Sequence, residues 1–177
     1  MHPIKSIGVT IDKSLIPWSS QYVRVEEQAY YTVRRPLSLT LGRLFVRDLK
    51  GQVVFSLTKE QPFVPTYVMN RTDKSPIVIR KANPGYWVCE DEGCTWEVHR
   101  YSSIKCILST EGRQMAIMSL SASLPFMDEG KIFLRVHDSR HLDLALAVAL
   151  LVDGFSLNLN PILFNNNKVI ATTAQSV

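Results

Sequence analysis

The sequence lacks an apolar run long enough to cross a bilayer. Its longest such run, Leu144–Val152, has nine residues, whereas a spanning helix needs roughly 20. Asp143 and Asp153 bracket the run. Residues 1–18 contain no long apolar core and no small-residue cleavage site, so we expect no secretory signal. These absences predict a chain that is not transmembrane and that lies in the cytoplasm or peripherally at a membrane.

Cysteine is also scarce. The three cysteines, an odd number at irregular spacing, do not make a disulfide framework, which favours a reducing compartment. Cys89, Cys94, His99 and Cys106 do not have the spacing of a standard zinc site. Cys89 and Cys94 flank a predicted turn and could face each other, whereas Cys106 alternates with apolar residues and is predicted to lie in the core. We expect no metal site.

Motifs of the common catalytic and nucleotide-binding sites are absent. The sequence has no glycine-rich phosphate loop, nucleophile elbow or helix-turn-helix, and no interleaved aromatic and basic motif. His137, Asp138 and His141 cluster around Ser139, but helix capping is enough to explain Asp138 and Ser139. We therefore expect no enzymatic activity, no catalytic residue, no cofactor and no nucleic-acid partner.

The composition and patterning of the sequence indicate one globular domain with an unusual helix. The 177 residues are 46% hydrophobic and 20% charged, with a net charge of +4, which permits an anionic partner without requiring one. Leucine and alanine dominate the long apolar run, so we predict a helix over 140–153. Asp138 or Ser139 is its expected N-cap, Asp143 suits the first turn, and Gly154 suits the position after its end. A helix without a polar face must be enclosed on all sides.

The preceding chain predicts the enclosure. Short alternating segments are separated by turn signals such as Asp48–Gly51, Glu90–Gly93 and Thr110–Arg113. Strands spaced in this way indicate an antiparallel sandwich or barrel, and a barrel around the helix satisfies both parts of the chain. The predicted strand segments are 44–46, 53–57, 66–69, 77–80, 86–89, 95–101, 104–108, 115–117 and 132–136.

The stretch GRLFVRDLKGQVVFSLT resembles the first hairpin of the tubby C-terminal-like superfamily, in particular its LURP-one-related branch. The matching positions are Phe45, Val46, Asp48, Gly51, Val54 and Phe55. Val33–Leu39 takes the place of that family's short first strand, and YWVCEDEGCTWEVHRY resembles its mid-domain hairpin. The resemblance implies a mainly β fold, an antiparallel β-barrel of about twelve strands enclosing one central hydrophobic α-helix near the C-terminus.

The resemblance covers roughly residues 20–157. It divides the chain into an N-terminal extension at 1–19, the barrel at 20–157 with its helix at 140–153, and a C-terminal tail at 158–177. The family domain usually ends close to its helix, so the tail is a departure. The paired basic constellation by which tubby proteins hold phosphoinositides is not found, nor is the acidic calcium segment of the related scramblases, so no functional residue carries over.

Basic residues give the remaining functional indication, since they crowd the two first predicted hairpins. Charged residues facing outward from a barrel commonly serve solubility alone. Two hypotheses remain open. The first is a non-enzymatic binding module that engages anionic phospholipids (phosphoinositides) or a protein partner. The second is a small-molecule or lipid-handling protein, enzymatic or not, with a cavity at the barrel mouth near His137 or His141. The candidate headgroup ligands are Arg34, Arg35, Arg43, Arg47, Arg71, Lys74, Arg80 and Lys81.

Overall fold

The computed structural model describes residues 6–12, 20–34, 42–60, 66–91, 93–101, 105–120 and 131–152. Within these residues, twelve strands precede a short 3-10 helix and one α-helix. The strands are β1 Ile7–Asp12, β2 Gln21–Val25, β3 Gln28–Arg34, β4 Arg43–Asp48, β5 Val53–Lys59, β6 Thr66–Arg71, β7 Ile77–Asn83, β8 Tyr86–Asp91, β9 Cys94–Arg100, β10 Lys105–Thr110, β11 Arg113–Leu120 and β12 Lys131–Val136.

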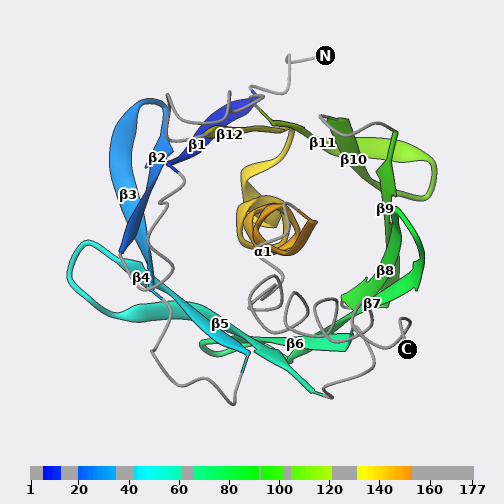
Figure 1. Cartoon of the computed structure of the whole chain (residues 1–177), viewed down its shortest axis with the longest axis horizontal. Helices are drawn as coiled ribbons and strands as arrows, with labels where there is room; N and C mark the ends of the chain where they lie inside the picture. The colour runs from blue at the N-terminus through cyan, green and yellow to red at the C-terminus, as the bar shows by residue number, and fades with distance from the viewer. Residues whose placement is uncertain are drawn as a thin grey trace, which may run out of the picture.

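The strands form one closed antiparallel barrel (Figure 1). Consecutive strands pair with each other, and β1 closes the circle against β12, with Ile7 opposite Val136 and Asp12 opposite Lys131. Closure leaves no strand edge unpaired. The predicted fold class is therefore confirmed. β1 belongs to the barrel, which starts earlier than the boundary at residue 20 that the sequence predicts. The predicted tail at 158–177 lies outside the described residues.

Alternation along the strands separates an apolar interior from a polar exterior. In β12, Ile132, Leu134 and Val136 are buried while the residues between them are exposed. The same alternation places apolar side chains from all twelve strands in one continuous core. Because side chains in a strand point to alternate faces, each strand supplies one row to the interior and one row to the surface.

The helix fills the centre of the barrel, as Figure 1 shows. The 3-10 helix Ser139–His141 leads into α1, Leu142–Val152, and the Asp138 carboxylate caps the start by accepting a hydrogen bond from the Arg140 backbone N–H at 3.0 Å. Every side chain from Leu144 to Leu151 is at most 6% exposed. These findings confirm the prediction of an enclosed apolar helix and of Asp138 as its cap.

Candidate functional site: the two ends of the barrel

The barrel has two distinct ends because α1 enters it at one and finishes at the other. β12 ends at Val136 and the chain turns inward through His137 and Asp138 into the helix. We call this the helix-N end. The opposite end, where α1 reaches Val152, is the helix-C end. Since neighbouring strands are antiparallel, each strand that begins at one end finishes at the other, and this fixes the end at which each charged residue lies.

Carboxylates are distributed unevenly between the ends, whereas basic residues occur at both. At the helix-C end the described acidic residues are Asp12 and Glu60, and the basic residues are Arg34, Arg43, Lys59, Arg80, Lys81, Arg100, Lys105 and Lys131. Glu97 lies mid-strand in β9, and every other described carboxylate lies at the helix-N end: Glu26, Glu27, Asp48, Asp73, Glu90, Asp91, Glu111, Asp138 and Asp143. The described part of the helix-C end is therefore strongly positive.

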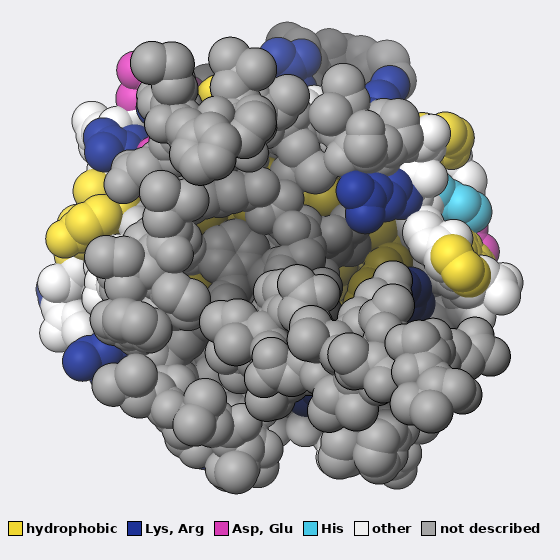
Figure 2. All heavy atoms as spheres, viewed as in Figure 1, with side chains coloured by type: hydrophobic (Ala, Val, Ile, Leu, Met, Phe, Trp, Pro, Cys, Tyr) yellow, Lys and Arg dark blue, Asp and Glu magenta, His cyan; other side chains and the backbone are white. Residues whose placement is uncertain are grey.

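The predicted headgroup residues divide between the ends. Four of the eight lie at the helix-C end: Arg34, Arg43, Arg80 and Lys81. Arg71 and Lys74 lie at the helix-N end, Arg47 lies near that end on the outer face of β4, and Arg35 lies outside the described residues. The Lys and Arg side chains that are visible in Figure 2 lie at separate points around the barrel.

One group of arginines does converge, around Phe45 on the outer face of β3 and β4. Arg34 lies directly opposite Phe45 across the two strands. The guanidinium carbons of Arg43 and Arg47 lie 5.6 Å and 5.8 Å from the centre of the Phe45 ring, which is within cation–π range. Arg43 Nε donates to Thr58 Oγ1 at 3.3 Å and Arg47 Nη1 to the Gly51 carbonyl at 2.7 Å. No described carboxylate pairs with any of the three arginines. Arg34 and Arg43 are exposed, whereas Arg47 is partly buried and its Nε has no hydrogen-bond partner.

Arg71, by contrast, is part of the structure of the helix-N end. Its Nη2 donates to Asp91 Oδ1 at 2.7 Å and its Nη1 to Asp91 Oδ2 at 3.2 Å, while the two side chains are only 7% and 12% exposed. The neighbouring Asp143, at the start of α1, has a pKa raised by burial, and Lys74 and Arg71 oppose the rise. Burial, with the nearby Asp143 carboxylate, also raises the pKa of Tyr31 to about 12.

The cysteines and histidines do not gather into a site in the described part of the chain. Cys89 and Cys94 do not face each other: Cys89 lies opposite Trp96, and Cys94 lies opposite Asp91. Cys94 is exposed, whereas Cys89 and Cys106 are buried, and burial raises their thiol pKa to about 12 and about 11. The core position predicted for Cys106 is confirmed.

The two histidines near the start of the helix each lie against a neighbouring side chain. His137 Nε2 lies 3.1 Å from the Gln114 amide nitrogen, and the His141 ring lies 4.6 Å from that of Trp96. A space beside the helix, between α1 and strands β10, β11 and β12, measures only about 10 Å³ and its lining is apolar. That volume holds no more than about one water molecule.

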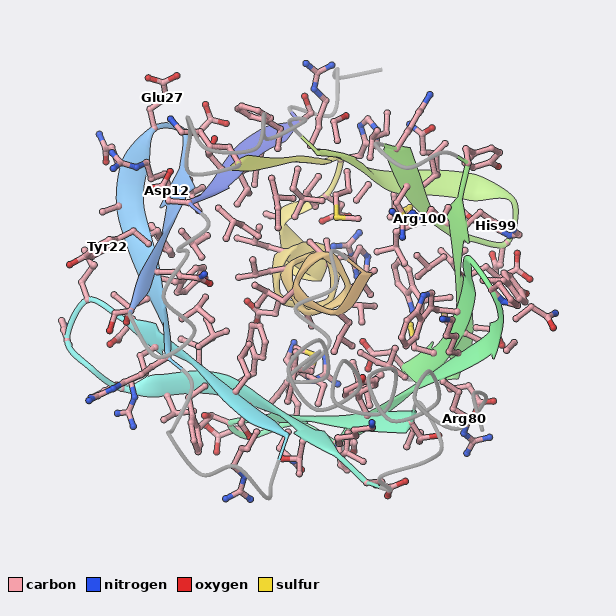
Figure 3. The ribbon with its side chains drawn as sticks, viewed as in Figure 1. Asp12, Tyr22, Glu27, Arg80, His99 and Arg100 are labelled. Atoms are coloured by element: carbon pink, nitrogen blue, oxygen red, sulfur yellow. The ribbon has the colours of Figure 1, made fainter. Side chains whose placement is uncertain are left out.

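Four basic residues of the helix-C end were not among the predicted candidates: Lys59, Arg100, Lys105 and Lys131. Each stands at the end of its strand, and only Arg100 and Lys105, five residues apart, are close in the sequence. Figure 3 shows that Arg100 from β9 points toward the inside of the barrel mouth, whereas Arg80 from β7 points outward. Sequence spacing does not group them, because only strand direction brings them to one end.

Comparison with known proteins supports the fold. No protein-family model matches this sequence, and no curated protein matches it. The chain is similar to the X-ray structure of a protein from Arabidopsis thaliana, AT5G01750, with a TM-score of 0.55 and 12% identity, covering 83% of this chain and 90% of that chain. At this identity the likeness concerns the fold alone. Among the described residues, no helix combines the length and apolar content needed to cross a membrane.

Proposed function

We propose that this chain is a non-enzymatic binding module of the tubby-like type, in the LURP-one-related branch, and that the helix-C end of its barrel engages anionic phospholipid headgroups such as phosphoinositides. The proposed location is the cytoplasm, peripheral to a membrane. The observation that carries the proposal is the near-absence of described carboxylates at an end that holds eight Lys and Arg residues. The twelve-stranded barrel, its central helix and the likeness to the Arabidopsis protein support the assignment to this type of fold.

The separation of charge between the two ends of the barrel would favour binding of the basic end to an anionic membrane. Each Lys or Arg near an anionic membrane surface gains about 1 kcal/mol, and the attraction fades beyond a Debye length of about 10 Å. Because most of the described acidic residues lie at the far end, the helix-C end can approach an anionic surface with little repulsion. Arg34 and Arg43, which lie at this end, suit phosphate oxygens, because a guanidinium can donate two parallel hydrogen bonds to them.

The alternative is a small-molecule or lipid-handling protein with a cavity beside the helix. The described interior is filled by apolar side chains, and the space found beside the helix is about 10 Å³. A ligand that must enter the barrel would have to displace α1, whose side chains are among the most buried in the protein. We therefore favour binding at the surface over binding inside the barrel.

Vesicle co-sedimentation tests the proposal. We expect the full chain to bind phosphatidylcholine vesicles that contain phosphatidylinositol bisphosphate and to ignore vesicles of phosphatidylcholine alone. Replacing Arg34 and Arg43 by Ala removes about 2 kcal/mol of attraction, which is a loss of about 30-fold in affinity. Raising the salt concentration should weaken the wild type and reduce this difference.

A matched variant separates the position of the charge from its amount. Lys50 and Arg113 are exposed at the helix-N end, so Lys50→Ala with Arg113→Ala removes the same charge from the other end. We expect this variant to bind within about twofold of the wild type. Equal losses in the two double variants, or no binding to any anionic vesicle at low salt, would refute the proposal.

A further inference from the structure

A hollow of about 470 Å³ lies on the outer wall of the barrel, away from both the helix and the arginines around Phe45. Strands β1, β11 and β12 line it, and the turn between β2 and β3 contributes Glu26 and Glu27 to the lining. The residues that matter for its chemistry are Gly8, Thr10, Glu26, Glu27, Phe133 and Arg135. A volume of this size lies in the range of about 300 to 1,000 Å³ that is typical of ligand sites.

Gly8 creates the depth of the hollow. It occupies an outward position in β1, next to the buried Val9, and a Cβ atom added there would meet nothing within 4 Å. A side chain would therefore fit at this position without a clash. Glycine inside a strand weakens the strand and often marks a point where a ligand or another backbone approaches closely.

Opposite charges flank this glycine. Arg135 of β12 lies directly across from Gly8. On the other side, the Glu26 backbone N–H donates to the Gly8 carbonyl at 2.9 Å, and the Gly8 N–H donates to Glu26 Oε1 at 3.1 Å. Neighbouring strands lie about 4.8 Å apart, so the acidic and basic sides of the hollow are separated by about 10 Å. Within the described residues, Arg135 and Glu27 form no ion pair.

The turn that carries the two glutamates has an unfavourable backbone. Glu26 and Glu27 have φ values of 49° and 68°, in the left-handed region where Asn and Gly are preferred for such a two-residue turn. Residues held in this region tend to occur at functional sites. Figure 3 shows Glu27 pointing outward at the rim of the barrel. The turn thus holds two carboxylates at the hollow, although Asn and Gly at these two positions would form the same turn more easily.

Phe133, directly opposite Thr10 of β1, adds an apolar surface beside Arg135, which is two residues away on β12. It follows Ile132 in β12 and is 48% exposed, on the same outer face as Arg135. An exposed aromatic ring beside charges of both signs offers a peptide segment an apolar contact in addition to ionic ones. In an extended peptide, side chains at alternate positions project from the same face.

We propose that this hollow binds an extended segment of a partner protein that carries a basic, an apolar and an acidic side chain at alternate positions. The basic side chain faces Glu26 and Glu27, the apolar one fills the space above Gly8 against Phe133, and the acidic one pairs with Arg135. The three positions span about 13 Å of extended chain, which matches the separation of the charges once side-chain length is included. The site lies on the wall of the barrel and is independent of the proposed membrane-binding end.

A titration followed by amide NMR tests this inference on the full chain. The probe is the blocked peptide acetyl-Lys-Ser-Leu-Ser-Asp-amide, and the control peptide replaces its Lys by Gln and its Asp by Asn. We expect shifts at the amides of Gly8, Glu27 and Phe133, with a dissociation constant at or below about 1 mM, and at least about fivefold weaker binding of the control peptide.

Two variants of the protein make the result specific. Gly8→Val fills the hollow, and because valine favours strands it should leave the melting temperature unchanged or raise it, yet it should weaken peptide binding at least about tenfold. Thr95→Val, at an exposed outer position of β9, should bind as the wild type does. Absence of shifts up to about 10 mM peptide, equal binding of both peptides, or unaltered binding by Gly8→Val would overturn the inference.

Discussion

Replacing Asp91 by Ala should be among the most destabilising single changes to a charged residue in this barrel. The change leaves the Arg71 guanidinium, which is 7% exposed, without the carboxylate that binds it at 2.7 Å and 3.2 Å. Arg71 would keep its hydrogen bond to the Ser75 carbonyl at 3.0 Å, but its Nε already has no partner. Removing one member of a buried ion pair costs about 3 to 5 kcal/mol.

Urea unfolding measures this loss. With a slope of about 2 kcal/mol per molar urea, a loss of about 4 kcal/mol moves the midpoint down by about 2 M. The control is Asp12→Ala, which removes the exposed pair between Asp12 and Arg24, whose side chains are 21% and 49% exposed. That pair should contribute at most about 1 kcal/mol. The joint replacement Arg71→Met with Asp91→Leu should recover most of the loss. If Asp91→Ala costs no more than Asp12→Ala, burial does not govern this pair.

Three further outcomes follow from burial and capping. Ala147→Asp places an unpaired charge at the centre of the barrel, which costs several kcal/mol of a total stability of about 5 to 15 kcal/mol. Circular dichroism should therefore show an unfolded chain, whereas the control Ala82→Asp, at an exposed position, should fold. A folded Ala147→Asp variant would contradict the role of α1. Maleimide should label only Cys94 in native protein and all three cysteines in urea, as counted by mass spectrometry, and labelling of a second cysteine in the native state would contradict the burial of the other two. Hydrogen bonds from Arg140 lower the pKa of Asp138 from 3.8 to about 2. Asp138 therefore stabilises the fold above pH 4, and this contribution disappears as the pH falls to about 2. Asp138→Asn should flatten the change in unfolding free energy across that interval, and an unchanged slope would refute the argument.

Local signals in the sequence predicted most of the fold. The helix was predicted at 140–153 and α1 occupies Leu142–Val152, because an apolar run with a capping aspartate is a local feature. The turns before β5, β7, β9 and β11 were likewise evident from their Gly, Asp and Ser residues. β1 and β2 were not predicted. The place of β1 depends on pairing with β12, which lies far along the chain.

The distribution of charge could not be predicted in the same way. Arg71 and Arg80 are only nine residues apart in the sequence, yet the turn between β6 and β7 places them at opposite ends of the barrel. Lys105 and Lys131 are isolated in the sequence, yet both begin strands at the helix-C end. The residues that share one end of the barrel depend on the direction of every strand. If one strand is missed in the prediction, the charged residues of the strands that follow are assigned to the wrong end.

The order of elements along the chain determines when this protein can become compact during synthesis. β12 and α1 are the last of the described elements, and the closing contact joins Ile7 to Val136. Until residues 131–152 leave the ribosome, the first eleven strands have an uncovered apolar inner face and two open edges, β1 and β11, which can pair with other chains. Closure between distant strands is also slow. At about 5 to 20 residues per second, the nascent chain is exposed to aggregation for several seconds, and a chain stopped before residue 131 would never leave that state.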